Sequence, residues 1–258
     1  MVMTPQTEKV AWITGAGTGI GEGSARALAK TGVKVALSGR REDVLRGVAD
    51  DIIKDGGTAQ VYPLDVADPD AVSATVAAIS KKFGRIDILV HSAGLNRPKR
   101  AWSDTDVESW QAVLRVNLDG AFYCCSAVMP IMREQQDGLI ITISSWAGRH
   151  TSRVAGMPYS TSKSGVNAMT ETINMEECVN GIRACSICPG EVATPILDLR
   201  PNPPSAEDRA NMLQQEDLGD IVAFLSQLHP RVCINDLLVS PTHNRGYVGA
   251  IRASQKQG

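Results

Sequence analysis

Seven short apolar runs alternate with longer helical patterns along the whole chain. The runs cover residues 9–15, 33–39, 58–65, 85–94, 138–145, 182–190 and 233–240, and each is apolar enough to be covered on both faces. Strands that are buried on both faces are typical of parallel sheets, because crossover helices pack on each side of them. The alternation therefore predicts an α/β fold with a doubly wound parallel sheet of about seven strands flanked by helices.

The segments between these runs predict the covering helices. They span residues 19–32, 42–57, 68–84, 107–136, 159–179 and 216–228, most of them with an apolar period near 3.6 and several closed by glycine. No repeat, linker or low-complexity tract divides the chain, so we expect one Rossmann-fold domain over residues 1–258. A proline-rich segment, residues 194–215, interrupts the regular pattern after a predicted strand, and we interpret it as a candidate substrate lid.

The charge balance excludes some classes of partner. The chain has 26 basic and 28 acidic residues and a formal charge of −2, so it has no general attraction for nucleic acid or for an anionic membrane. The N-terminal residues lack the pattern of a secretory signal, and no apolar run is long enough to cross a membrane. We expect a cytoplasmic protein.

Six cysteines are present, and their spacing does not suggest a metal site. The single C-x-x-C, Cys185 to Cys188, lies in a predicted strand, where positions three apart point to opposite faces. We therefore expect no metal and interpret the cysteines as buried free thiols.

A glycine-rich turn follows the first predicted strand. The stretch "TGAGTGIG", residues 14–21, leads directly into a helix, and Gly15, Gly19 and Gly21 would let the backbone approach a pyrophosphate at the positive end of that helix. The G-x-x-x-G-x-G order differs from the common G-x-G-x-x-G, and a glycine cluster alone is weak evidence. Its place after the first strand favours dinucleotide binding.

The second predicted strand ends in "SGRR", which bears on the choice of cofactor. A site that selects NAD is expected to carry an acidic residue here, but the chain has Gly39, Arg40 and Arg41. Guanidinium groups can bind a 2′-phosphate bidentately, whereas an acidic side chain would repel it. The pattern therefore favours NADP, with NAD as the alternative. These arginines could also be solvated surface charges at the start of a helix.

Tyr159 and Lys163 stand four positions apart in "MPYSTSKSG". This spacing places them on one side of a helix, and by itself it describes an ordinary surface pair. The surrounding chain changes that interpretation, because an ordered series of short motifs accompanies the pair: the glycine turn, "LD" ending at Asp65, "HSAG" at residues 91–94, Asn117 in "VNLDG", Ser145 in "ISSWAG" and "PGEVAT" at residues 189–194.

This series resembles the short-chain dehydrogenase/reductase family, from about residue 8 to residue 242. The resemblance implies that Tyr159 is the acid/base, that Lys163 lowers its pKa and holds the nicotinamide ribose, that Ser145 binds the substrate oxygen and that Asn117 carries a water in a proton relay. It implies the following cofactor-binding residues: Gly15, Thr18, Gly19, Ile20, Gly21, Arg40, Arg41, Asp65, Val66, Ser92, Ala93, Gly94, Tyr159, Lys163, Pro189, Gly190, Val192 and Thr194.

Three features of the sequence depart from the family pattern. His91 and Ser92 stand where the family usually has an asparagine pair. Ser145 lies one position further from Tyr159 than the usual spacing, which indicates an insertion in the loop 149–158 and leaves Ser144 as the weaker candidate. The C-terminal "CINDLLVSPTHNRGYVG" is similar to the branch that contains hydroxy-acid and serine dehydrogenases using NADP.

The chemistry of these residue types supports the same function. A phenol with a pKa of about 10 is a poor base at neutral pH, but a neighbouring ammonium group favours its ionised form. Hydride can then pass between NADP(H) and the carbinol or carbonyl carbon of a small alcohol or ketone while Tyr159 exchanges the proton on oxygen.

Other functions were weighed against this one. An NAD-dependent dehydrogenase of a neutral polyol or sugar is the nearest alternative, and a non-catalytic NADP-binding sensor would not need Tyr159, Lys163 and Ser145. Ser160 to Lys163 matches S-x-x-K and Lys30 to Gly32 matches K-T-G, both known from penicillin-binding enzymes, but their order is reversed and S-D-N is absent.

Two further expectations concern the substrate and the assembly. Basic groups on two predicted mouth loops favour an anionic substrate, although such groups are more often surface charges; they are Arg97, Lys99, Arg100, Arg149, His150 and Arg153. The resemblance implies a homotetramer in which the helix around residues 108–135 and the Tyr159 helix contact partner copies. Phe122, Met129 and Ile131 on the first helix fit such a contact, and burial within one subunit explains them equally well.

Overall fold

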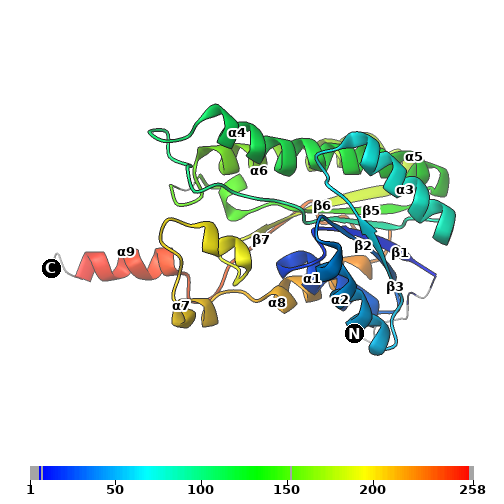
Figure 1. Cartoon of the computed structure of the whole chain (residues 1–258), viewed down its shortest axis with the longest axis horizontal. Coiled ribbons are helices and arrows are strands. Elements are labelled where there is room, and N and C mark those ends of the chain that lie inside the picture. The colour runs from blue at the N-terminus through cyan, green and yellow to red at the C-terminus, as the bar shows by residue number, and fades with distance from the viewer. Residues whose placement is uncertain (1–5, 7, 152, 256–258) are drawn as a thin grey trace.

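The computed structural model describes residue 6 and residues 8–151 and 153–255. Its centre is a parallel sheet of seven strands in the order β3-β2-β1-β4-β5-β6-β7 (Figure 1). The strands are β1 (Val10–Thr14), β2 (Lys34–Gly39), β3 (Ala59–Pro63), β4 (Ile88–His91), β5 (Gly138–Ile143), β6 (Ile182–Pro189) and β7 (Asp236–Val239). The doubly wound sheet predicted from the alternating runs is confirmed.

Helices cover both faces of the sheet (Figure 1). One face carries α1 (Gly19–Lys30), α2 (Glu42–Lys54) and α8 (Gln215–Ser226), and the other carries α3 (Pro69–Phe83), α4 (Val107–Leu114), α5 (Gly120–Gln135) and α6 (Met157–Glu177). A π-helical turn, Arg115–Asp119, joins α4 to α5, so the single helix predicted over residues 107–136 is locally widened.

The alternation of side chains along the strands explains the continuous apolar runs. In β1, Ala11 and Ile13 pack into the core beneath α1, α2 and α8, while Val10 and Trp12 pack into the core beneath α3, α5 and α6. Each central strand must therefore be apolar at every position. The edge strands β3 and β7 are partly exposed, so the expectation that every strand is covered on both faces is wrong for these two.

Capping residues set the ends of several helices. Asp68 accepts hydrogen bonds from the backbone N–H groups of Asp70 and Ala71 at the start of α3, Pro69 occupies its first turn, and Gly84 ends it in the left-handed conformation. The N-terminus of α1 differs, because its capping residue, Thr18, makes no side-chain hydrogen bond to the helix. The first N–H groups of α1 thus lack a side-chain cap, as do those of α2 and α6.

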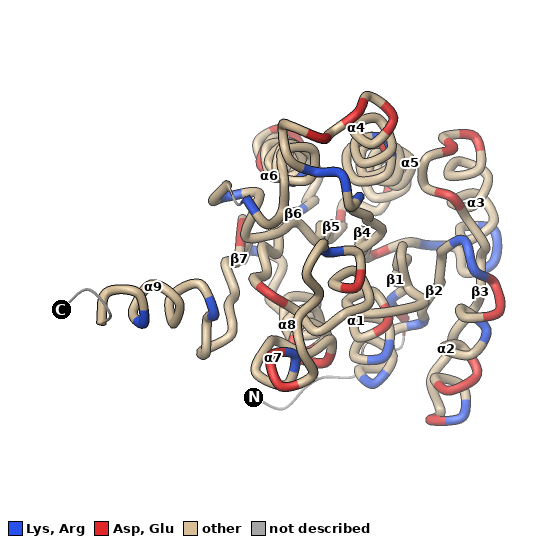
Figure 2. The backbone as a smooth tube through the Cα atoms, turned by 60° about the vertical axis from the view of Figure 1, so that its left-hand side comes forward, with Lys and Arg blue, Asp and Glu red and all other residues tan. Residues whose placement is uncertain are grey.

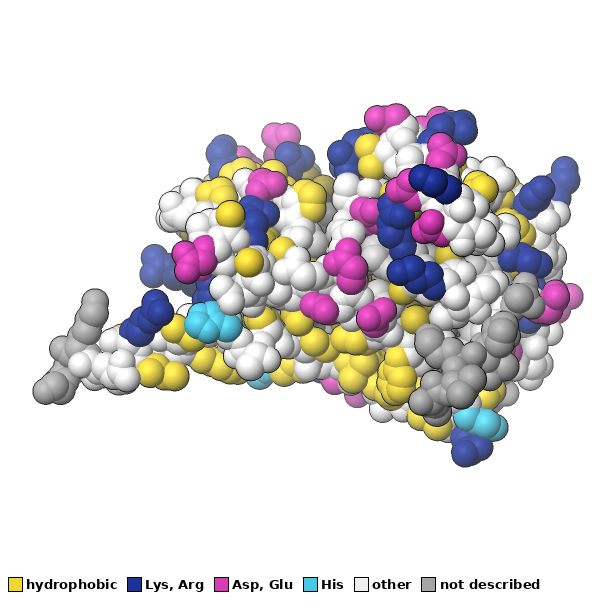
Figure 3. All heavy atoms as spheres, turned by 90° about the horizontal axis from the view of Figure 1, so that it is seen from below, with side chains coloured by type: hydrophobic (Ala, Val, Ile, Leu, Met, Phe, Trp, Pro, Cys, Tyr) yellow, Lys and Arg dark blue, Asp and Glu magenta, His cyan; other side chains and the backbone are white. Residues whose placement is uncertain are grey.

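Two short helices were not predicted from the sequence. The first is α7 (Ala206–Ala210), within the proline-rich segment, and the second is α9 (Arg245–Gln255), which projects from the body and carries hydrophobic side chains along its length (Figures 1 and 3). No described helix is both long and apolar enough to cross a membrane.

Charges and thiols are distributed much as expected, with one correction. Over the described residues, Lys and Arg alternate with Asp and Glu on the helices instead of forming one stripe (Figure 2). Cys124, Cys125, Cys185 and Cys188 are buried free thiols, but Cys178 and Cys233 are exposed, against the expectation that all six are buried. No cluster of possible metal ligands occurs in the described part of the chain.

Candidate active site

Three glycines of the turn after β1 lie where a side chain would collide with the protein. Gly15 has a φ of +65°, and a Cβ atom there would lie 2.8 Å from the backbone nitrogen of Ala93. A Cβ atom at Gly21 would lie 2.3 Å from the carbonyl oxygen of Gly15. Gly19, with a φ of +58°, approaches the side chain of Thr194 in the same way. The turn is therefore a bare backbone surface at the N-terminus of α1, which suits an anionic pyrophosphate.

Beneath this turn, the side chain of Thr14 contacts the buried ring of His91. The hydroxyl of Thr14 accepts hydrogen bonds from the backbone N–H groups of Ser92 and Ala93, each at 3.2 Å, and lies 3.1 Å from Nδ1 of His91. Because both hydroxyl lone pairs are in use, its proton is donated to Nδ1. His91 is then neutral with its proton on Nε2, and burial lowers its pKa to about 3.

The end of β2 carries two exposed cations. Arg40 and Arg41 line the cavity beside the glycine turn, and neither makes an ion pair with another described residue. The uncapped start of α1, the bare glycine surface and these guanidinium groups together fit a dinucleotide that carries an extra phosphate.

Helix α6 brings Tyr159 and Lys163 to the cavity. Gly156, with a φ of +83°, sets the chain at the start of this helix, and Pro158 lies in its first turn. Lys163 is 4% exposed, its Nζ donates to the carbonyl oxygen of Ile143 at 2.7 Å, and this Nζ lies 5.7 Å from the centroid of the Tyr159 ring. Burial lowers the pKa of Lys163 to about 8.

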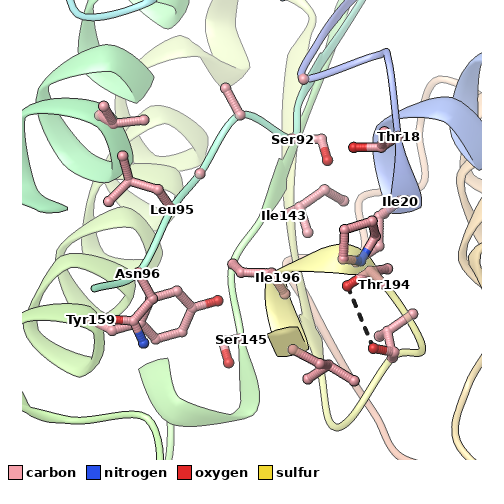
Figure 4. A pocket seen from close by; sticks show the side chains of 18 of the residues that line it. Thr18, Ile20, Ser92, Leu95, Asn96, Ile143, Ser145, Tyr159, Thr194 and Ile196 are labelled. Atoms are coloured by element: carbon pink, nitrogen blue, oxygen red, sulfur yellow. Dashed lines mark hydrogen bonds between the residues drawn. The ribbon is translucent and has the colours of Figure 1, made fainter. Parts of the chain in front are cut away.

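The environment of Tyr159 differs from the expectation in one respect. Burial raises the pKa of Tyr159, and the groups that oppose this rise are the Ser145 hydroxyl and then Arg200 and Arg100. The sequence assigned this effect to Lys163, which is not among the groups that lower the pKa here. Ser145 is also the serine that faces Tyr159 across the cavity (Figure 4), whereas Ser144 donates its hydroxyl to the carbonyl oxygen of Lys163.

Asn117 lies in the π-helical turn and is fully buried. Its side-chain oxygen accepts from the backbone N–H of Leu95 at 2.8 Å, and its side-chain nitrogen donates to the carbonyl oxygen of Leu95 at 2.9 Å and to the hydroxyl of Ser162 at 3.1 Å. The amide thereby fastens the loop after β4 to α6. A π-helical turn often marks a functional position, because it displaces one residue from the helical pattern.

A cavity of about 380 Å³ collects these elements at the carboxyl ends of the strands. It opens beyond the ends of β1 and β4, the neighbouring strands at which the strand order reverses. Ligands bind at this point in doubly wound sheets. Of the predicted site residues, Asn117 and Gly21 lie behind the cavity wall. The others line it: Gly15, Thr18, Gly19, Ile20, Arg40, Arg41, Asp65, Val66, Ser92, Ala93, Gly94, Ser145, Tyr159, Lys163, Pro189, Gly190, Val192 and Thr194.

Several lining residues were missed by the sequence analysis. Asn96 stands beside Tyr159 (Figure 4), and its side chain bridges to the carbonyl oxygen of Ala155 at 2.9 Å. Apolar walls are formed by Leu95, Ile143, Val154, Ile196 and Leu197, and Glu191 and Arg200 add charge. No local motif distinguishes these residues, and only their position after the strand ends could have drawn attention to them.

The basic mouth loops predicted from the sequence are mostly outside the cavity. Of the six groups only Arg100 lines it. Lys99 pairs with Asp106 at 2.9 Å, Arg149 pairs with Asp236, and His150 packs against Trp146. Arg97 and Arg153 are exposed. The interpretation of these five as surface groups is the correct one.

The proline-rich segment covers one side of the cavity. Val192 pairs with Leu213, so residues 194–212 leave the body and return to the same place. Within the segment, Thr194, Pro195, Ile196, Leu197 and Arg200 line the cavity. Arg245 ties the base of α9 to this region, because it pairs with Glu191 at 2.7 Å and with Asp208 at 2.9 Å.

The comparisons with known proteins agree with this geometry. Residues 9–203 match the family model described as short chain dehydrogenase. An uncharacterised oxidoreductase of Staphylococcus aureus (strain MRSA252) is 34% identical over 93% of this chain and 100% of its own length, and one of Staphylococcus saprophyticus is 36% identical over the same shares.

Solved structures are similar over most of the chain. The alcohol dehydrogenase of the archaeon Thermococcus sibiricus, complexed with 5-hydroxy-NADP, has a TM-score of 0.82 at 27% identity and covers 91% of this chain and 97% of its own. An actinorhodin polyketide ketoreductase variant with NADPH has a TM-score of 0.83 at 30% identity, with 92% and 97% covered. From the sequence match, the relatives and the shared fold, we conclude that this chain belongs to the short-chain dehydrogenase family of oxidoreductases.

Proposed function

We propose that this oxidoreductase transfers a hydride between NADP(H) and the carbinol or carbonyl carbon of a small alcohol or ketone. The observation that carries the proposal is the convergence of Ser145, Tyr159 and Lys163 on one cavity that also contains the bare glycine turn. The cofactor, when bound, supplies or accepts the hydride. Every other part of the chemistry falls to side chains of this chain.

Tyr159 is proposed as the acid/base that exchanges the proton on the substrate oxygen, and Ser145 as the group that orients this oxygen. The positions of the two side chains support these roles, because both line the cavity and face each other across it (Figure 4). Lys163 is proposed to hold the nicotinamide ribose. Its charge is held close to the Tyr159 ring by the carbonyl oxygen of Ile143.

Asn117 is proposed to position a proton relay. Its buried amide holds both backbone groups of Leu95, in the loop that follows β4. The preceding residue, Gly94, lies between Asn117 and Lys163, since a Cβ atom there would be 3.5 Å from both the Asn117 oxygen and Nζ of Lys163. A water carried by this pocket would connect Lys163 with solvent.

NADP is proposed in preference to NAD. Arg40 and Arg41 are exposed at the end of β2, where a 2′-phosphate would be read, and two similar solved structures carry NADP or NADPH. The alternative is an NAD-dependent dehydrogenase of a neutral polyol or sugar. We further propose that the segment 194–215 acts as a substrate lid, because it returns to its starting point and lines the cavity.

The proposal is tested by following the nicotinamide absorbance of NADPH and of NADH while a panel of ketones and keto acids is added. We expect oxidation of NADPH with a higher kcat/KM than of NADH for at least one compound. A chain that binds NADPH but turns over no compound in either direction would instead be a non-catalytic sensor.

We also propose a homotetramer. Phe122 on α5 is 56% exposed, and the end of α6 leads to two further exposed apolar side chains, Met175 and Val179. Met129 and Ile131 are partly buried and pack against the core of their own subunit, so they do not contribute to the argument. Light scattering at micromolar concentration is expected to give four times the subunit mass, and a monomeric mass would contradict the proposal.

A further inference from the structure

Two arginines share the Tyr159 end of the cavity. Arg100 comes from the loop after β4 and Arg200 from the candidate lid after β6, and both line the cavity. Each acts electrostatically on Tyr159, and Arg200 also acts on Arg100. Two guanidinium groups this close to one phenol require either anionic partners or a ligand.

Each guanidinium nitrogen of Arg100 donates a hydrogen bond to a carbonyl oxygen of the protein. It is 6% exposed, and its guanidinium donates to the carbonyl oxygens of Arg97 at 2.8 Å, Val154 at 3.2 Å and Leu199 at 2.7 Å. These carbonyls belong to the three loops that follow β4, β5 and β6. Arg100 therefore fastens three walls of the cavity together, but none of its partners neutralises its charge.

Arg200 is bound differently. Its Nη1 donates to Oε1 of Glu191 at 2.5 Å, and neither Nε nor Nη2 has a hydrogen-bond partner among the described residues. The side chain is 18% exposed. Nε and Nη2 form one edge of the guanidinium with two parallel N–H groups, which is the edge that matches a carboxylate bidentately.

The carboxylates nearby do not balance these cations. Glu191 is the one acidic residue that lines this end of the cavity in the described chain, and it also accepts two hydrogen bonds from Arg245, at 2.7 and 2.8 Å. Asp65 lines the opposite end, near Arg40. Three cationic side chains thus face the cavity around Tyr159, namely Arg100, Lys163 and Arg200. Glu191 is their shared counter-charge, so the net charge at this end of the cavity is positive.

A cofactor at the glycine turn would not balance this positive charge. Its phosphates are expected at the glycine turn and at Arg40, and the lid meets that turn at Thr194, beside Gly19. Arg200 lies six positions further along the lid, next to Leu199, whose carbonyl is held by Arg100. Besides Glu191, it acts electrostatically on Arg100 and Tyr159, which belong to the substrate side.

We propose that Arg200 binds an anionic group of the substrate, a carboxylate, through its Nε and Nη2 edge, so that the substrate is a hydroxy acid or the corresponding keto acid. This inference rests on the proposed function and names the substrate class of the same site. The carboxylate supplies the missing negative charge, and its bidentate contact fixes the distance between the charged end of the substrate and Tyr159.

The test compares keto acids with their amides or methyl esters in the NADPH assay. Hydrogen bonds to charged groups contribute about 1.5–3 kcal/mol, so we expect the parent protein to prefer the acid by roughly 10- to 100-fold in kcat/KM. Arg200→Gln should remove this preference: kcat/KM should fall at least tenfold more for the acid than for the amide, because the loss of charge near Tyr159 affects both compounds and the bidentate contact affects the acid alone. Sulfonate and phosphate analogues of the same length distinguish a carboxylate site from one that accepts any oxyanion.

The controls use other arginines of the chain. Arg209→Gln is the matched control, because Arg209 lies on the same segment, pairs with Asp198 and does not line the cavity. The Arg209→Gln variant should prefer acids over amides by the same factor as the parent protein. Arg200→Lys keeps the charge but cannot bind a carboxylate bidentately, so it should retain part of the preference for acids. This variant keeps the proposal testable if Arg200→Gln does not fold. Arg100→Gln should lower kcat/KM for acid and amide alike, because it loosens the cavity walls.

Three results would overturn the assignment. Equal kcat/KM for acid and amide in an active parent protein would show that no anion is recognised. An increased Kd for NADPH in Arg200→Gln, with the acid preference intact, would assign Arg200 to the cofactor. Absence of turnover with every carbonyl compound would instead remove the proposed function, and this inference with it.

Discussion

The two ends of the cavity are built in different ways. At the glycine turn the walls are backbone, and the residues that shape them, Gly15 to Gly21, lie next to one another in the chain. At the lid the walls are side chains held by contacts between distant segments, such as Arg100 with Leu199 and Arg245 with Glu191. The first end is suited to the shared parts of a dinucleotide, and the second can change its substrate with a few substitutions.

This difference leads to separable effects of substitution. A change at the lid end should alter turnover or substrate choice and leave cofactor affinity nearly unchanged. A change at the turn end should do the reverse.

The largest effect is expected for Tyr159→Phe. The variant removes the oxygen that exchanges a proton with the substrate, and general acid/base catalysis contributes roughly 10²-fold or more, so kcat should fall by at least about 100-fold. The Kd for NADPH, measured by fluorescence titration, should change by less than about threefold, because only the hydroxyl is lost. Tyr247→Phe on α9 serves as the control and should retain full activity. Residual activity within about tenfold of the parent would contradict the assignment of the acid/base.

The next largest effect is expected for Arg40→Asp at the turn end. Aspartate repels a 2′-phosphate and can accept a hydrogen bond from a ribose hydroxyl, so the ratio of kcat/KM for NADPH and NADH should invert. The acid-to-amide preference at the lid end should stay the same. Arg46→Asp on the outer surface of α2, where Arg46 pairs with Glu42, is the matched control. A parent protein with the higher kcat/KM for NADH would show that "SGRR" was misread.

Much of the turn end could be predicted from the sequence. A run of apolar residues on both faces of β1, followed by closely spaced glycines and a helix, has few other structural solutions. The same is true of Tyr159 and Lys163, since one helix carries both and their spacing fixes their common direction.

The lid end could not be predicted in the same way. Arg200 was overlooked because its role depends on which of its N–H groups are used by Glu191, and this depends on how residues 194–212 fold back. Conversely, Lys99 and Arg149 were proposed as substrate-binding groups, although acidic residues elsewhere in the chain pair with them. A charged residue in a loop is a poor guide until its ion-pair partners are known.

The next prediction concerns His91→Asn, beneath the glycine turn, and the pH dependence of the free energy of unfolding. Below its ordinary pKa of 6.5 the unfolded chain binds a proton at His91, whereas the folded chain excludes it until the pH approaches about 3. The unfolded state therefore binds more protons in this window, and the free energy of unfolding falls as the pH falls from 6.5 toward 3, by up to about 1.4 kcal/mol per pH unit.

Urea unfolding at a series of pH values measures this slope. The His91→Asn variant should show a shallower loss of stability in acid than the parent, and His229→Asn, at an exposed histidine, should follow the parent. Identical slopes for the parent and His91→Asn would mean that His91 accepts a proton in the folded protein. That result would replace the neutral tautomer, which carries its proton on Nε2, with a charged ring.

The smallest effect is expected for a glycine of α2 that lies outside the turn. Gly47 occupies an exposed position inside the helix, and a Cβ atom there would meet no heavy atom within 4 Å. Gly47→Ala should raise the free energy of unfolding by about 0.5–1 kcal/mol, because alanine restricts the unfolded chain and favours the helix. Gly21→Ala is the contrasting variant: its Cβ would lie 2.3 Å from the carbonyl oxygen of Gly15, so it should lower both stability and NADPH affinity. If both variants bind NADPH as the parent does, the backbone at the turn tolerates a side chain and the proposed difference between the two ends of the cavity is wrong.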